Sequence, residues 1–200
     1  MPKIQTPWGP PDTVIRLDPD DMILRVHTCS HGGIGVHPLQ SIPPHIAACA
    51  QVDSEGWRWF EEDVAAAAVI LAFPHLFGQS TLAAAKDSLR NNLPATYTEH
   101  FGEVLTAANS RAIAQREFEA STRDNFIVTA GFGSSFWNVP CGYVYACGFR
   151  QRDEDTAGFL VPAAKYVTPE RIILDEFPRW EPDRTLPMKK RDPELTAQAQ

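Results

Sequence analysis

The stretch that decides the fold is WRWFEEDVAAAAVILAF, which covers residues 57–73 of the 200-residue chain. Residues 64–73 are apolar all round, which is typical of a helix that lies at the centre of a protein. Pro74 follows and helps to end such a helix, because proline cannot continue the hydrogen-bond ladder. We therefore expect one buried helix over residues 57–73, whose apolar positions recur at helical spacing at Phe60, Val64, Ala67, Ala68 and Leu71.

Two more helices are expected after this one. Ser80 is a suitable N-cap for a helix that runs to about Asn92. Thr96 and Glu99 have the spacing of a capping box and predict a third, longer helix that continues to about Ala120.

Short runs typical of strands lie on both sides of these helices. A small antiparallel meander fits residues 12–37, and further strands are expected at residues 125–130, 141–149, 157–161 and 171–174. Strands, then helices, then strands predict the α+β class: one domain over residues 1–178, with a mostly antiparallel sheet and about three helices on one face. Proline and charge dominate residues 179–200, which predicts a flexible tail.

The composition limits the classes of function. The chain has 18 Lys and Arg against 25 Asp and Glu, which gives a formal net charge of -7. A strongly basic protein that binds nucleic acid directly is therefore not expected. Residues 64–73 form the longest apolar run, and a bilayer span needs about 20 residues. With no export signal visible, we expect a cytoplasmic protein with reduced thiols at Cys29, Cys49, Cys141 and Cys147.

The segment HTCSHGGIG, residues 27–35, is the most suggestive for chemistry, and three interpretations compete. His27, Cys29 and His31 are competent metal ligands, but a regular strand would separate the two histidines by about 13 Å. His31-Gly32-Gly33 could form the oxyanion hole of an esterase, although the matching G-x-S-x-G nucleophile motif is absent from the sequence. The favoured interpretation is a turn whose glycines accept positive φ and whose histidine bonds the local backbone.

Other chemistry-bearing residues are interpreted as structural. Glu61, Glu62 and Asp63 could be paired carboxylates, but consecutive helical positions point about 100° apart, which favours a charge cluster at a helix start. Trp57 and Trp59 could form a binding edge or anchor the core. Cys141 and Cys147 would lie about 20 Å apart on a strand, too far for a disulfide, and are expected to be buried. Because no nucleotide or zinc signature is present, no cofactor is predicted.

Landmarks spread along the chain resemble those of a bacterial domain-of-unknown-function family. They are Thr6-Pro7-Trp8-Gly9-Pro10, His31-Gly32-Gly33-Ile34, Trp57 with Phe60-Glu61-Glu62-Asp63, Ala72-Phe73-Pro74, Leu89-Arg90, Val139-Pro140 with Gly142, and Phe159-Leu160-Val161-Pro162. The similarity covers about residues 6–165. The resemblance implies an accessory protein of plasmids, integrative elements and phages, encoded near antirestriction genes, and it supplies no catalytic residues.

Three hypotheses of function follow. The first is a non-catalytic protein that binds and interferes with a host defence complex, of the anti-CRISPR or antirestriction type, by competing for a basic nucleic-acid-binding surface. Its expected contacts are Trp57, Glu61, Glu62, Asp63 and the hairpin-tip residues Asp153, Glu154 and Asp155. The second is a small hydrolase or modifying enzyme that uses His31, Glu61 and Glu62. The third is a self-associating module, such as a homodimer, that uses Trp57, Trp59 and Trp137.

Overall fold

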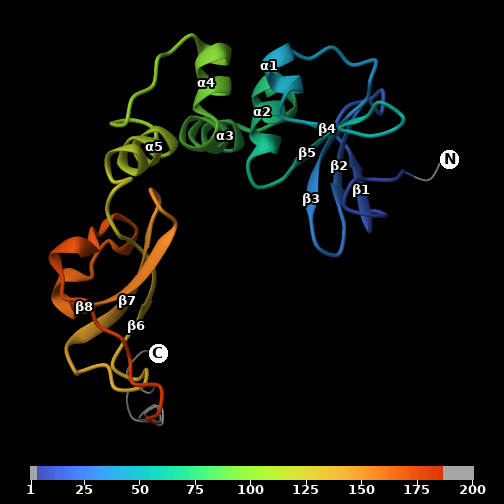
Figure 1. Ribbon diagram of the computed structural model, residues 1–200. Helices are drawn as coiled ribbons and strands as arrows, with labels where there is room; N and C mark the ends of the chain where they lie inside the picture. The colour runs from blue at the N-terminus through green and yellow to red at the C-terminus, as the bar shows by residue number, and fades with distance from the viewer. Residues whose placement is uncertain (1–3, 187–200) are drawn as a thin grey trace. The chain divides into compact units, whose positions relative to one another are not determined.

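The computed structural model describes residues 4–186, which form two compact units that divide between Gln115 and Arg116 (Figure 1). Each unit has its own antiparallel sheet. The α+β class predicted from the sequence is confirmed, although the strands form two sheets rather than one. The extent of a single domain, residues 1–178, stays a prediction.

The sheet of the N-terminal unit contains the predicted meander. Its strand order is β1-β2-β3-β5-β4, and all neighbouring strands are antiparallel. The strands are β1 (Thr13–Arg16), β2 (Ile23–His27), β3 (Gly32–Val36), β4 (Gln51–Val52) and β5 (Arg58–Glu61).

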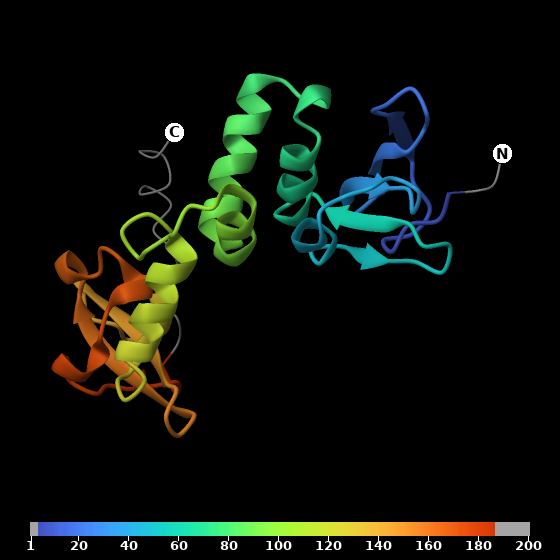
Figure 2. The same cartoon turned by 90° about the horizontal axis from the view of Figure 1, so that it is seen from above.

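The two faces of this sheet carry different layers. One face packs Ile23, Ile34 and Phe60 into a core with α2 (Ala65–Ala72), and the short α1 (Pro44–Ala47) lies beside that helix. The other face carries Leu24, Val26 and Trp59, with Ile4, Trp8 and Trp57 packed against them. Figure 2 shows α2 beside α3 (Gln79–Asn92), which extends the helical layer away from the sheet.

The helix predicted over residues 57–73 is wrong in its first part. Residues 58–61 are strand β5, paired with β3, and α2 begins only after Val64. Trp59 and Phe60 are both almost fully buried on opposite faces of the sheet, an alternation of period two that a helix could not provide. Glu61, Glu62 and Asp63 therefore precede the helix, whose first turn holds no acidic residue.

The second predicted helix is confirmed as α3, but the third is two helices. The second of these, α5 (Arg111–Ser121), is separated by a loop from α4 (Pro94–Phe101). Gly102 ends α4 in the left-handed region, with φ of 70°, which is a common helix terminator. The predicted capping box does not form, because α4 begins at Pro94, with Leu93 as its N-cap and no side-chain cap.

The C-terminal unit is built on the sheet β6-β7-β8. Its strands are β6 (Ile127–Phe132), β7 (Tyr143–Arg150) and β8 (Asp155–Pro162), and its core gathers around Phe126, Phe159 and Leu174. The strand expected at residues 171–174 is wrong. Two short 3-10 turns, η3 (Pro169–Arg171) and η4 (Leu174–Glu176), flank Ile173, and within this segment only Ile173 forms a bridge, to Ile127. Two similar turns lie elsewhere in the chain, η1 (Pro74–Leu76) and η2 (Ala163–Lys165).

The first residues of the predicted tail contact β8. The Trp180 N–H donates to the Gly158 carbonyl oxygen at 2.9 Å, and the Gly158 N–H donates to a Glu181 carboxylate oxygen at 3.1 Å. The rest of that prediction, residues 187–200, lies outside the described residues. Among residues 4–186, none of the helices has the length and apolar character needed to span a bilayer.

Candidate functional site

The turn between β2 and β3 differs from the predicted glycine turn. Thr28 closes it, because its N–H and its hydroxyl both donate to the His31 carbonyl oxygen, at 2.7 and 2.9 Å. Gly32 and Gly33 belong to strand β3 and do not have positive φ. They are required for space instead: a Cβ at Gly33 would collide with the Trp8 ring and with the Phe60 carbonyl oxygen.

The residues weighed as metal ligands or as an enzyme centre do not converge. His27, Cys29 and His31 are exposed, and within residues 4–186 no group of three His, Cys, Asp or Glu could hold a metal ion. Alternation along β5 places Glu61 on the tryptophan face and Glu62 on the helix face. His31, Glu61 and Glu62 therefore do not form one site.

The remaining acidic contacts predicted for a partner are largely engaged within the chain. Arg150 donates to both carboxylate oxygens of Asp153, at 2.9 and 3.0 Å, and to Asp155 at 3.3 Å. This bidentate pairing lowers the pKa of Asp153 and offsets the charge of the hairpin tip. Glu154 occupies the left-handed region at the same tip, with φ of 56°.

The thiols are free, as expected. Cys29 and Cys141 are exposed, and Cys49 and Cys147 are half-buried. The expectation that Cys141 is buried is therefore wrong, because β7 begins only at Tyr143 and leaves Cys141 in the preceding turn.

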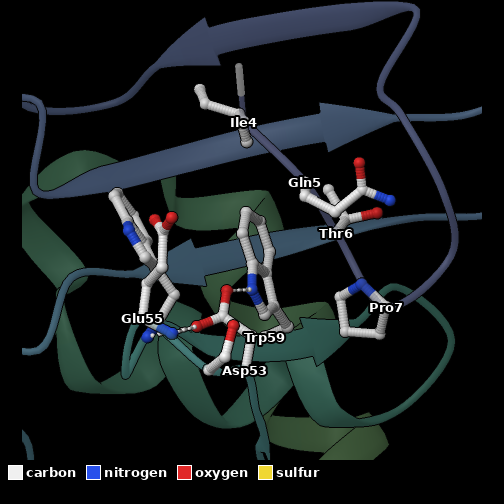
Figure 3. Close-up of a pocket in the computed structure, with 9 residues that line it drawn as sticks. Ile4, Gln5, Thr6, Pro7, Asp53, Glu55 and Trp59 are labelled. Atoms are coloured by element: carbon white, nitrogen blue, oxygen red, sulfur yellow. Dashed lines mark hydrogen bonds between the residues drawn. The ribbon is translucent and has the colours of Figure 1, made fainter. Parts of the chain in front are cut away.

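The tryptophan pocket lies on the face of the first sheet that the helices do not cover. We use this name for the hollow of about 200 Å³ lined by Ile4, Gln5, Thr6, Pro7, Asp53, Ser54, Glu55, Trp57 and Trp59. In Figure 3 residues 4–7 run along one side of the Trp59 ring and Glu55 lies on the other. The pocket thus joins the N-terminal segment to the loop before β5.

Asp53 organises the loop on the acidic side of the tryptophan pocket. One carboxylate oxygen accepts the N–H groups of Glu55 and Trp57, both at 2.9 Å, and the other accepts the indole N–H of Trp59 at 2.8 Å (Figure 3). These bonds satisfy the donor of a buried indole and fix the loop conformation. Glu55 is thereby presented to solvent at the rim.

Aromatic rings form the apolar part of this pocket. Trp57 stacks on Trp59 with ring centroids 5.6 Å apart, and Trp8 meets Trp59 edge-on at 6.3 Å. Trp59 is buried, whereas Trp57 is half-buried and keeps part of its ring available. No basic side chain is among the described residues that line the pocket, so its two carboxylates and indole rings suit a cation.

A second hollow, the β2 pocket, lies on the helix face. We define it by its lining residues Arg25, His27, Gly33, Ile34, Glu62, Ala66 and Ile70, which border a hollow of about 190 Å³ that is open to solvent. The missing side chain of Gly32 makes room for two of them, because a Cβ there would collide with Glu62 and would lie 3.0 Å from His27 Nδ1.

Sequence reasoning named Trp57, Trp59, His27 and Glu62 but did not group them in this way. Arg25, Asp53 and Glu55 were missed altogether. A signal for Arg25 was present, because residues 23, 25 and 27 share one strand face, so that two ionisable residues follow Ile23 on its buried side. For Asp53 there was no comparable signal, since its bond to Trp59 depends on β4 and β5 being paired.

Two polar clusters farther along this unit have structural roles. The Tyr97 hydroxyl donates to Glu103 at 2.7 Å; this bond lowers the pKa of Glu103, and burial raises the pKa of Tyr97. His45 Nε2 and His100 Nδ1 lie 3.2 Å apart and join α1 to α4, where burial and the neighbouring His45 lower the pKa of His100.

Comparisons with known proteins identify the first unit. No curated protein and no solved structure matches the chain. The family model described as "Domain of unknown function (DUF7007)" matches residues 2–123, a range that contains all five strands of the first sheet and ends just after α5. The resemblance drawn from the sequence reached to about residue 165, so its landmarks at residues 139–142 and 159–162 lie outside the match. The chain belongs to the DUF7007 family.

Proposed function

We propose that this protein is a non-catalytic binding protein whose tryptophan pocket takes a lysine or arginine side chain of a partner protein. The observation that carries the proposal is that the half-buried Trp57 ring and the carboxylates of Asp53 and Glu55 line the same hollow. A cation above an indole face gains about 0.5–2 kcal/mol, and a nearby carboxylate adds directional hydrogen bonding.

The charge of the first unit supports a basic partner. Residues 1–115 contain seven Lys or Arg against twelve Asp or Glu, which leaves a formal charge of -5 on this part of the chain. Such a potential steers a basic partner toward the unit and disfavours acidic ones. The association rate should accordingly fall as salt screens the charges.

The proposed partner is a nucleic-acid-binding protein of a host defence complex. The resemblance to accessory proteins of mobile elements supports this assignment, and a defence protein that grips nucleic acid carries the basic surface that the pocket requires. By occupying that surface, the chain would keep nucleic acid from it. The proposed outcome is an anti-CRISPR or antirestriction effect without any catalytic step.

The binding step can be tested on the purified chain with two short peptides. Acetyl-Ala-Lys-Ala-amide should change the tryptophan fluorescence saturably, and the peptide with norleucine in place of lysine should not, because only the first carries a cation. Trp57→Leu and Glu55→Gln should each lower the affinity for the lysine peptide about threefold or more. Trp137→Leu and Glu154→Gln, in the other unit, serve as matched controls that should bind as the wild type does.

The cellular role is tested separately by transformation efficiency. Cells with an active restriction or CRISPR system should accept a targeted plasmid more often when they express the wild-type chain than when they express Trp57→Leu. Equal efficiencies with wild type, Trp57→Leu and an empty vector would reject the defence partner. If the lysine and norleucine peptides bind equally well, the tryptophan pocket is not a site for a cationic side chain.

A further inference from the structure

The helix-facing side of β2 departs from the pattern of a core strand. Residues 23, 25 and 27 share that side, yet only Ile23 joins the core, and Arg25 and His27 follow it. Arg25 is half-buried and His27 is exposed, so the core-facing side of β2 continues with two ionisable residues where apolar ones are usual, and such departures concentrate at functional sites. The β2 pocket forms where these two side chains leave the core.

An imidazole from β2 and a carboxylate from the residue just after β5 both line this pocket. His27 pairs with Gly32 in the strand register, and the Glu62 N–H donates to the Gly32 carbonyl oxygen at 3.1 Å, so the three residues form one row across the sheet. His27 Nδ1 and a Glu62 carboxylate oxygen both approach the place where a Gly32 Cβ would lie. Among the described residues, 4–186, no hydrogen bond or ion pair joins the two side chains, so each keeps hydrogen-bonding capacity for a ligand in the pocket.

The rest of the β2 pocket supplies a fixed positive charge and an apolar floor. The Arg25 guanidinium carbon lies 5.9 Å from the centroid of the Phe77 ring, which helps to hold it at the pocket. Ile34, Ala66 and Ile70 provide the apolar surface. A cavity of about 150 Å³ can hold benzene, so about 190 Å³ has room for a small molecule.

We propose that the β2 pocket binds a free α-amino acid with an aliphatic side chain. Arg25 pairs with the ligand carboxylate, because a guanidinium matches that group in charge and geometry. Glu62 and the His27 imidazole accept hydrogen bonds from the ammonium group, and the apolar floor takes the side chain. The site lies on the opposite face of the sheet from the tryptophan pocket and does not depend on the function proposed there.

The test is an NMR titration of the full chain with three related probes. L-leucine carries both charged groups, 4-methylpentanoate lacks the ammonium group, and isoamylamine lacks the carboxylate. Leucine should shift the signals of Ala66 and Ile70 saturably. Each of the other two probes should bind at least about tenfold more weakly than leucine, because one charged contact is lost.

Variants make the assignment specific. Arg25→Gln and Glu62→Gln should each lower the affinity for leucine about tenfold. Arg111→Gln and Asp63→Asn remove the same charges from exposed positions outside the pocket and should leave binding unchanged. The proposal fails if leucine gives no saturable shift up to about 10 mM. It also fails if 4-methylpentanoate binds as well as leucine, or if both pocket variants retain wild-type affinity.

Discussion

Gly35 lies where the ring of Trp59 crosses strand β3. A Cβ at this position would lie 2.5 Å from Trp59 Cζ3 and 2.9 Å from Cε3, far inside van der Waals contact. Gly35→Ala should therefore lower the free energy of unfolding by about 1–3 kcal/mol, the usual range for overpacking a core. Urea titration followed by tryptophan fluorescence measures the change.

Gly133→Ala is the matched control for that substitution. Nothing lies within 4 Å of a Cβ at Gly133, which is exposed in the loop after β6 and does not have positive φ. Its stability should stay within about 0.5 kcal/mol of the wild type. Equal effects of the two substitutions would contradict the close approach at Gly35.

Asp53 and Glu55 are expected to separate stability from binding. Asp53 accepts three hydrogen bonds, one of them from the buried Trp59 indole, so Asp53→Ala should destabilise the chain by about 1–3 kcal/mol. Glu55 is exposed, and Glu55→Ala should leave the urea midpoint nearly unchanged while it weakens the lysine peptide. A large loss of stability in Glu55→Ala would show that the rim carboxylate is part of the fold.

At the scale of elements, Glu103 ties the loop after α4 back to the helix layer and makes the unit sensitive to acid. Its pKa lies below the ordinary 4.5, chiefly because the Tyr97 hydroxyl donates to it. A carboxyl group with a lowered folded-state pKa stabilises the fold above its unfolded value, and that contribution is lost as the pH falls through the folded value. Wild-type stability should therefore decline below about pH 4.5 partly through this group.

Tyr97→Phe isolates that effect. The variant should be less stable than the wild type at pH 7, and the difference should shrink as the pH falls below 4.5, because protonated Glu103 no longer benefits from the bond. Urea midpoints measured across this pH range give the comparison. A difference that stays constant with pH would assign the role of Tyr97 to packing alone.

Elements defined by local sequence patterns were predictable, and elements defined by pairing between distant segments were not. Alternation in residues 143–150 and the run of residues 79–92 are local patterns, so the strand β7 and the helix α3 were predictable. The segment 57–61 was not, because its apolar residues fit both a helix and a strand, and pairing with β3 decided the matter. The tryptophan pocket was out of reach for a related reason: it joins residues 4–7 to residues 53–59, which only the folded chain brings together.

At the scale of the whole molecule, the two units have separate cores. The described core residues of the first are drawn from residues 4–105 and those of the second from residues 126–177. Phe60→Ala and Phe159→Ala each remove a buried ring from one core, at a cost of about 3–5 kcal/mol. Calorimetry should show that each variant lowers the melting temperature of a different transition. If both lower one common transition equally, the chain unfolds as the single domain that the sequence predicts.

The fit of glycine against tryptophan in the first sheet also constrains how the family can vary. A methyl group at residue 35 has no room while an indole occupies residue 59, so the effects of substitutions at these two positions should depend on each other. Positions 35 and 59 should therefore covary among relatives, a bulkier residue at the first accompanying a smaller one at the second. Relatives in which one of these positions changes without the other would not retain the packing of Trp59 against this sheet face.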